Sequence, residues 1–82
     1  MIVTVLFFAQ ARERAERDSL RLELPDGSRV VDALAAVRRA HPRLDSLWAH
    51  LAVAVDGRLS PGDATLLRDG AELALLPPVS GG

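Results

Sequence analysis

The fold is decided by residues 2–9, which read IVTVLFFA. β-Branched and aromatic residues in such a run favour a β-strand. Successive side chains of a strand point to opposite faces, and both faces here are largely apolar: Val3, Val5 and Phe7 form one, and Ile2, Thr4, Leu6 and Phe8 form the other. Because this strand is apolar on both faces, we expect residues 2–9 in the middle of a sheet.

The next segments predict a second strand and one main helix. Residues 10–18 are charged and predict a short exposed helix or a wide loop. Residues 19–24 alternate leucine with polar residues, which is typical of a half-buried strand. We expect Ser28 to be the N-cap of a helix, because a serine hydroxyl accepts hydrogen bonds from the first helical N–H groups. That helix should end near Ala40, since Pro42 disfavours helical backbone at the residue before it.

Shorter elements complete the order. Residues 44–51 have helical spacing and predict a short helix or turn that covers the core, with Trp48 packed inside it. Strands are expected at residues 51–55, 58–59 and 72–76, and the last must end at Pro77 because proline cannot donate to a ladder. This order favours an α+β domain, with one helix across a small mixed sheet over residues 1–76 and an extended tail over residues 77–82.

Composition excludes several classes of function. The 82 residues carry 10 basic and 11 acidic side chains, for a net charge of −1, which argues against a nucleic-acid-binding protein. The absence of cysteine excludes disulfides and thiolate metal sites, and the two histidines lack metal-ligand spacing, so we expect no metal. No apolar run approaches the ~18 residues of a membrane span, and the start lacks the features of a signal peptide. We therefore expect a cytoplasmic protein that binds no membrane.

The most informative segment is PPVSGG at residues 77–82. Two prolines favour a stiff, extended chain, and two terminal glycines can enter a narrow channel because they lack side chains. A terminal carboxylate becomes reactive only when it is activated, for instance as an acyl-adenylate. The sequence has no phosphate-binding GK[ST] motif, so activation would need a partner enzyme. A sulfur donor could then leave a thiocarboxylate. The alternative is that the two glycines are only a frayed end.

A docking surface is expected beside this tail. The sheet face away from the main helix should carry side chains from the first and last strands, namely Thr4, Leu6, Phe8, Glu72, Ala74 and Leu76. Phe8 and Leu76 would lie side by side near the root of the tail, and Leu59 could extend the patch. Exposed apolar patches mark interaction sites. The alternative is that the lid or a long loop covers these residues.

Two motifs carry a resemblance to a known family. They are VLFFAQARE at residues 5–13 and DGAELALLPPVSGG at residues 69–82. Over its whole length the chain resembles the ubiquitin-like β-grasp sulfur carriers, and most closely the small subunits of molybdopterin synthase. It departs from them at Leu75 and Leu76, where that family often has aromatic residues. The thiamine-pathway carriers are usually shorter and lack the Pro-Pro-Val-Ser ending.

The resemblance implies a ubiquitin-like β-grasp fold and a sulfur-transfer role. An E1-like adenylating enzyme would use ATP to convert the Gly82 carboxylate to an acyl-adenylate, and a sulfur donor protein would turn it into a thiocarboxylate. The tail would then enter the large subunit, where sulfur passes to cyclic pyranopterin monophosphate in molybdenum cofactor biosynthesis. The family complex is a heterotetramer whose active site lies on the large subunit, so this chain would bind no cofactor itself.

The resemblance also implies roles for individual residues. Gly82 would be the modified residue, preceded in the tail by Pro78, Val79, Ser80 and Gly81. Apolar contacts with the large subunit would come from Phe8, Leu59 and Leu76, and Arg12 would be a basic residue near that interface.

Two other functions stay open at this point. The chain could be a related carrier or modifier that serves tRNA thiolation or protein conjugation. It could also be a plain β-grasp binding module with an incidental tail.

Overall fold

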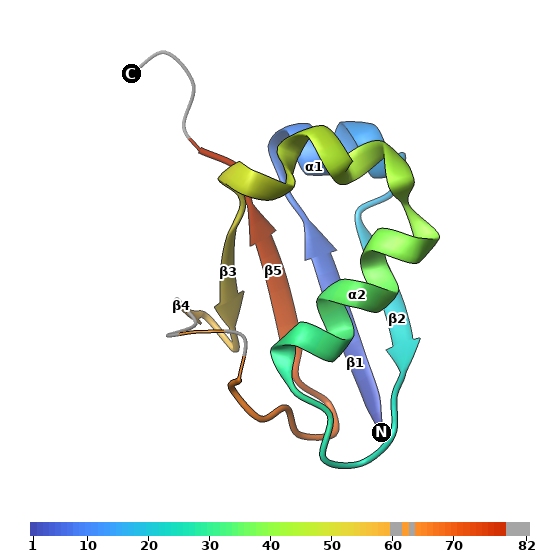
Figure 1. The fold of residues 1–82 in the computed structure, drawn as a ribbon, viewed down its shortest axis with the longest axis vertical. Helices are drawn as coiled ribbons and strands as arrows, with labels where there is room; N and C mark the ends of the chain where they lie inside the picture. The colour runs from blue at the N-terminus through green and yellow to red at the C-terminus, as the bar shows by residue number, and fades with distance from the viewer. Residues whose placement is uncertain (60–61, 63, 79–82) are drawn as a thin grey trace.

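Strand β1 (Ile2–Phe7) lies inside a mixed sheet with the order β2-β1-β5-β3-β4, as its two apolar faces predict. The computed structural model describes residues 1–59, 62 and 64–78. β1 pairs antiparallel with β2 (Ser19–Glu23) and parallel with β5 (Glu72–Leu76). Figure 1 shows β1 and β5 pointing toward the same end of the sheet. The strand is shorter than the expected residues 2–9, because Ala9 adopts a φ of 49° and begins a helix.

A tight hairpin forms the other half of the sheet. β3 (Ala52–Val55) runs antiparallel to β5 and pairs with the short β4 (Arg58–Leu59). Between them Asp56 and Gly57 both have positive φ, 50° and 84°, which is the backbone of a two-residue hairpin turn. Asp56 also exchanges hydrogen bonds with Glu72: its N–H donates to the Glu72 carbonyl at 2.8 Å, and its carboxylate accepts from the Glu72 N–H at 2.9 Å.

Helix α2 (Val30–Ala40) crosses one face of the sheet and ends where Pro42 predicts. The expected N-cap at Ser28 is wrong, because the capping residue is Arg29. The Ser28 hydroxyl instead donates to the Pro25 carbonyl at 2.7 Å and closes the preceding turn. The Arg29 N–H donates to the Asp32 carboxylate at 2.8 Å, so an acidic side chain inside the first helical turn satisfies the group at its start.

Two short helices close the end of the sheet toward which β1 and β5 point (Figure 1). The charged segment forms α1 (Ala9–Ala15), which buries Ala11 and Ala15 and exposes its charges. The expected lid is the 3-10 helix η1 (Pro42–His50), which buries Leu44 and Leu47. The two helices contact each other, so they cover this end of the core together.

The core lies between α2 and the helix-facing side of the sheet. Its largest fully buried side chains come from two strands, β1 and β5, and from α2 and η1: Val3, Val5, Val30, Val37, Leu44, Leu73 and Leu75. The opposite side of β1 and β5 is only half-buried. The expected α+β arrangement is therefore confirmed. None of the described helices has the length and apolar character needed to cross a membrane.

Replacing Leu75 by alanine should destabilise the domain far more than replacing its neighbour Leu76. Leu75 is fully buried in the core, whereas Leu76 is half-buried on the other face. We expect Leu75→Ala to cost about 2–5 kcal/mol and to lower the Tm by about 10 °C or more. Leu76→Ala should cost about 1 kcal/mol or less. Thermal unfolding followed by circular dichroism tests this, and equal losses would contradict the assignment of the two faces.

Candidate functional site

The parallel pairing of β1 with β5 brings two predicted site residues to one end of the sheet. The register places Leu6 beside Ala74 and Phe7 beside Leu75. Phe8 keeps an extended backbone, with φ −120° and ψ 151°, so it follows β1 as Leu76 completes β5. Phe8 is 44% exposed although it is a large apolar residue. The chain leaves β5 at this point, so Phe8 and Leu76 flank the root of the tail.

Leu59 joins the same face through the register of two further strand pairs, β5 with β3 and β3 with β4. Ala74 lies opposite Ala54, and Ala54 lies opposite Leu59, so these residues continue the row that starts at Leu6. Leu59 is 71% exposed and lies two strands from β5, which corresponds to about 10 Å. Ala54 and Ala74 have small side chains, so the surface between Leu6 and Leu59 is shallow. We call this surface the apolar face, and it consists of Leu6, Phe8, Ala54, Leu59, Ala74 and Leu76.

The lid does not cover the apolar face. Leu44 and Leu47 of η1 belong to the core on the helix-facing side, and η1 contacts α1 and α2. Of the alternative that the lid or a long loop covers these residues, the part that concerns the lid is therefore excluded. The two buried leucines hold η1 against the side of the sheet that α2 also covers.

Arg12 adds a cation beside the apolar face. It lies on α1 one turn after Phe8, and its backbone N–H donates to the Phe8 carbonyl at 3.3 Å. Its guanidinium is 3.8 Å from the Asp18 carboxylate, and both side chains are more than half exposed. An exposed ion pair of this kind contributes little to stability. Loss of the ion pair between Arg12 and Asp18 would therefore change the stability of the fold little.

The structure describes only the first part of the tail. Pro77 is half-buried and Pro78 is exposed. The predicted residues Val79, Ser80, Gly81 and Gly82 lie outside the described residues, and their roles stay predictions.

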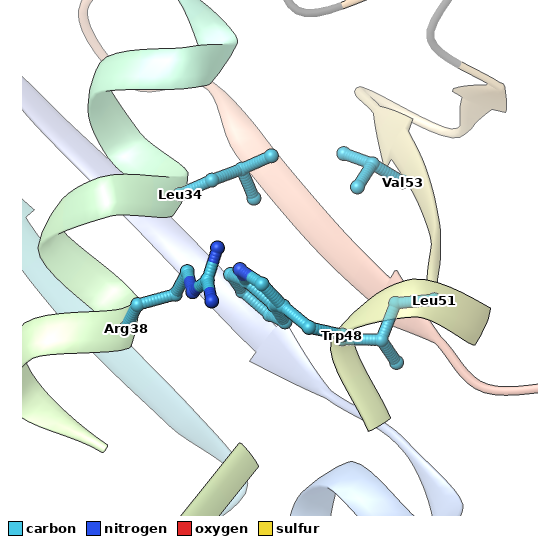
Figure 2. Close-up of a pocket in the computed structure, with 5 residues that line it drawn as sticks. All are labelled: Leu34, Arg38, Trp48, Leu51 and Val53. Atoms are coloured by element: carbon cyan, nitrogen blue, oxygen red, sulfur yellow. The ribbon is translucent and has the colours of Figure 1, made fainter. Parts of the chain in front are cut away.

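Trp48 lines a separate pocket on the helix-facing side, together with Leu34, Leu51 and Val53. It was expected in the core but is only half-buried. Figure 2 shows the Arg38 side chain reaching from α2 toward the indole, with the guanidinium carbon 5.3 Å from the ring centroid. Such a cation–π contact contributes about 0.5–1 kcal/mol at an exposed site. Nε of Arg38 also lies 3.9 Å from a carboxylate oxygen of Asp45, so Arg38 on α2 contacts two residues of η1.

The described residues form no catalytic or metal-binding cluster. No group of three or more histidine, aspartate or glutamate side chains among them could hold a metal ion. The site instead combines the apolar face with a chain that leaves the sheet at its edge. We did not predict from the sequence that the alanines of β3 belong to this surface. The alternation AVAV in residues 52–55 is the signal for it, because it separates an alanine face of the strand from a valine face.

Comparison with known sequences identifies the family. A family model described as the ThiS family matches residues 5–82. A molybdopterin synthase sulfur carrier subunit from Chlamydomonas reinhardtii is 41% identical over 83 residues, which cover 100% of both chains. The chain therefore belongs to the ThiS family, and its resemblance to molybdopterin synthase small subunits is confirmed.

Solved structures agree with this assignment. SAMP1 from Haloferax volcanii, the small archaeal modifier protein 1, matches with a TM-score of 0.91 and 33% identity over 100% of both chains. A chain in the complex of subunits 1 and 2 of the molybdopterin-converting factor from Helicobacter pylori 26695 matches with a TM-score of 0.74 and 28% identity, again over 100% of both chains. These matches confirm the ubiquitin-like β-grasp fold.

Proposed function

We propose that this chain is the sulfur carrier subunit of a molybdopterin synthase. The observation that carries the proposal is the position of the apolar face, which ends where the chain leaves β5. A surface in this place can hold a partner while the tail reaches into it. The full-length match to a molybdopterin synthase sulfur carrier subunit supplies the chemistry that the tail would perform.

The carrier step needs activation by a second protein. An E1-like adenylating enzyme would let the Gly82 carboxylate attack the α-phosphate of ATP and release pyrophosphate. A sulfur donor at the level of sulfide would then displace AMP and leave a thiocarboxylate. The ATP site and the sulfur donor belong to those partners, and this chain supplies the carboxyl group and the surface that presents it.

The delivery step follows on the large subunit. The thiocarboxylate sulfur would attack an oxygen-bearing carbon of cyclic pyranopterin monophosphate, the carbon–oxygen bond would break as that oxygen leaves, and water would cleave the resulting thioester. Sulfur then stays on the pterin and Gly82 returns to a carboxylate. Phe8, Leu59 and Leu76 would dock the small subunit, with Arg12 at the margin, and two such subunits on a large-subunit dimer would form a heterotetramer.

Removal of Gly82 should abolish sulfur loading, because it shortens the tail that carries the reactive carboxyl group, and should leave the fold intact, because the buried core is built from residues between Val3 and Leu75. The measurement is intact-mass spectrometry after incubation with the adenylating enzyme, ATP and a sulfur donor. The full chain should gain the mass difference between one sulfur and one oxygen, and the truncated chain should gain nothing. A full chain that gains no such mass under these conditions would falsify the proposed function.

Phe8→Ala should weaken binding to the molybdopterin synthase large subunit by about 30-fold, as expected for a large aromatic residue that the interface buries. Val31→Ala is the matched control, because Val31 is 45% exposed, close to the 44% of Phe8, but lies on α2. Titration calorimetry with each variant measures the effect. Similar affinities for the two variants would place the interface elsewhere.

Protein modification is the second candidate function. It is favoured by the match to SAMP1 from Haloferax volcanii at a TM-score of 0.91. A modifier would form covalent conjugates through Gly82, whereas a synthase subunit would not. A denaturing blot of cells that express the tagged chain separates the two. A ladder of high-mass bands that disappears on deletion of Gly82 would favour modification.

A further inference from the structure

The outer edge of β2 is a further surface with a defined backbone pattern. β2 lies at the end of the sheet order and pairs with β1 (Figure 1). Met1 and Leu24 exchange two backbone hydrogen bonds of 2.9 Å, which sets the alternation along this antiparallel ladder. Leu20 and Leu22 therefore direct their N–H and C=O groups toward β1. Arg21 and Glu23 direct theirs outward, away from the sheet.

The outward-facing residues of β2 differ in the hydrogen bonds and ion pairs that they already make. The Ser19 carbonyl accepts a hydrogen bond of 2.6 Å from Nε of Arg17. Within the described part of the chain, the side chains of Arg21 and Glu23 make no hydrogen bond or ion pair. Their cross-strand neighbours on β1 are uncharged. Two exposed, opposite charges thus stand on an edge that offers unpaired backbone groups.

We propose that a second copy of this chain docks on this edge, with β2 antiparallel to β2 about a twofold axis at Leu22. Arg21 then lies opposite Glu23 of the second copy, and the reciprocal pair forms on the other side of the axis. Both residues point their backbone groups outward, so each pair exchanges two backbone hydrogen bonds. Leu22 lies opposite its own copy and Leu20 opposite Leu24, so half-buried leucines become buried together.

Charge selects this register over its neighbours. The two β2 strands can shift relative to each other only in steps of two residues, because a shift of one residue would turn the leucines of one copy to the other face of the joined sheet. One such slide places Arg21 opposite Arg21, and the other places Glu23 opposite Glu23. Like charges directly opposite each other destabilise a sheet. Pro25 would face Ser19 in the favoured register, and the missing N–H of proline matches a carbonyl that Arg17 already occupies.

The proposed dimer leaves the apolar face free. β2 and β4 lie at opposite edges of the sheet, and Leu59 and Leu76 lie on the β4 side of β1. The twofold axis stands perpendicular to the joined sheet, so both apolar faces point to the same side and the two chain ends leave in opposite directions. The inference does not depend on the proposed function.

A charge swap tests the register. Sedimentation velocity of the full chain at concentrations up to about 1 mM should show a reversible dimer. Glu23→Arg places arginine opposite Arg21 at both pairs and should weaken the dimer by about tenfold or more. The double variant R21E/E23R restores opposite charges and should recover dimerisation. Glu13→Arg is the matched control, since Glu13 is an exposed acid on α1 and should leave the dimer unchanged.

A single introduced thiol tests the position of the axis. The chain has no cysteine, so Leu22→Cys carries one thiol. Facing residues of a non-hydrogen-bonded pair have Cα atoms about 4.5 Å apart, which a disulfide can bridge. Leu22→Cys should form disulfide-linked dimers on mild oxidation much faster than Leu20→Cys, whose opposite residue is Leu24. A wild-type chain that stays monomeric throughout, or equal behaviour of Glu23→Arg and the double variant, would overturn the proposal.

Discussion

The parallel pairing of β1 with β5 is the constraint on which the rest of the molecule depends. It joins strands that are almost 70 residues apart in the sequence and points both toward the same end of the sheet. The aromatic residue that follows β1 and the tail that follows β5 must therefore leave the sheet together. An antiparallel pairing would have placed Phe8 and the tail at opposite ends, and a partner bound at one could not have received the other.

The two sides of the sheet have different surroundings: one side packs in the core and the other carries the apolar face. Leu73 and Leu75 are fully buried beneath α2, whereas Ala74 and Leu76, one residue away from each, face outward. This alternation lets neighbouring residues serve different purposes. The core can stay tightly packed while the outer side keeps apolar residues that contribute little to folding. In a domain of 82 residues, which has only a thin margin of stability, this separation protects the fold from change at the interface.

The sequence predicts those parts of the fold that depend on local patterns. The two-sided apolar run of β1, the leucine alternation of β2 and the stop before Pro42 all appear in the structure. Local pattern failed at Ser28, because the turn before α2 uses the serine hydroxyl and leaves Asp32 to satisfy the helix start. Leu59 lies on the same face as Leu6 because of the register of four strands. That register is set by long-range pairing, which no local sequence pattern reveals. The PPVSGG ending itself pointed to a reactive terminal carboxylate, and the family resemblance added the expectation that Gly82 is the modified residue.

The two alanines between Leu6 and Leu59 have an evolutionary consequence. Ala54 and Ala74 keep the centre of the apolar face shallow, so a partner would have to supply the bulky side chains that fill it. A larger side chain at Ala74, which is half-buried on the outer side, would change the shape of this surface and leave the core beneath α2 unchanged. A lineage could therefore redirect the same scaffold to a different enzyme through a single substitution, which is one route by which related carriers could diverge in pathway while they retain one architecture.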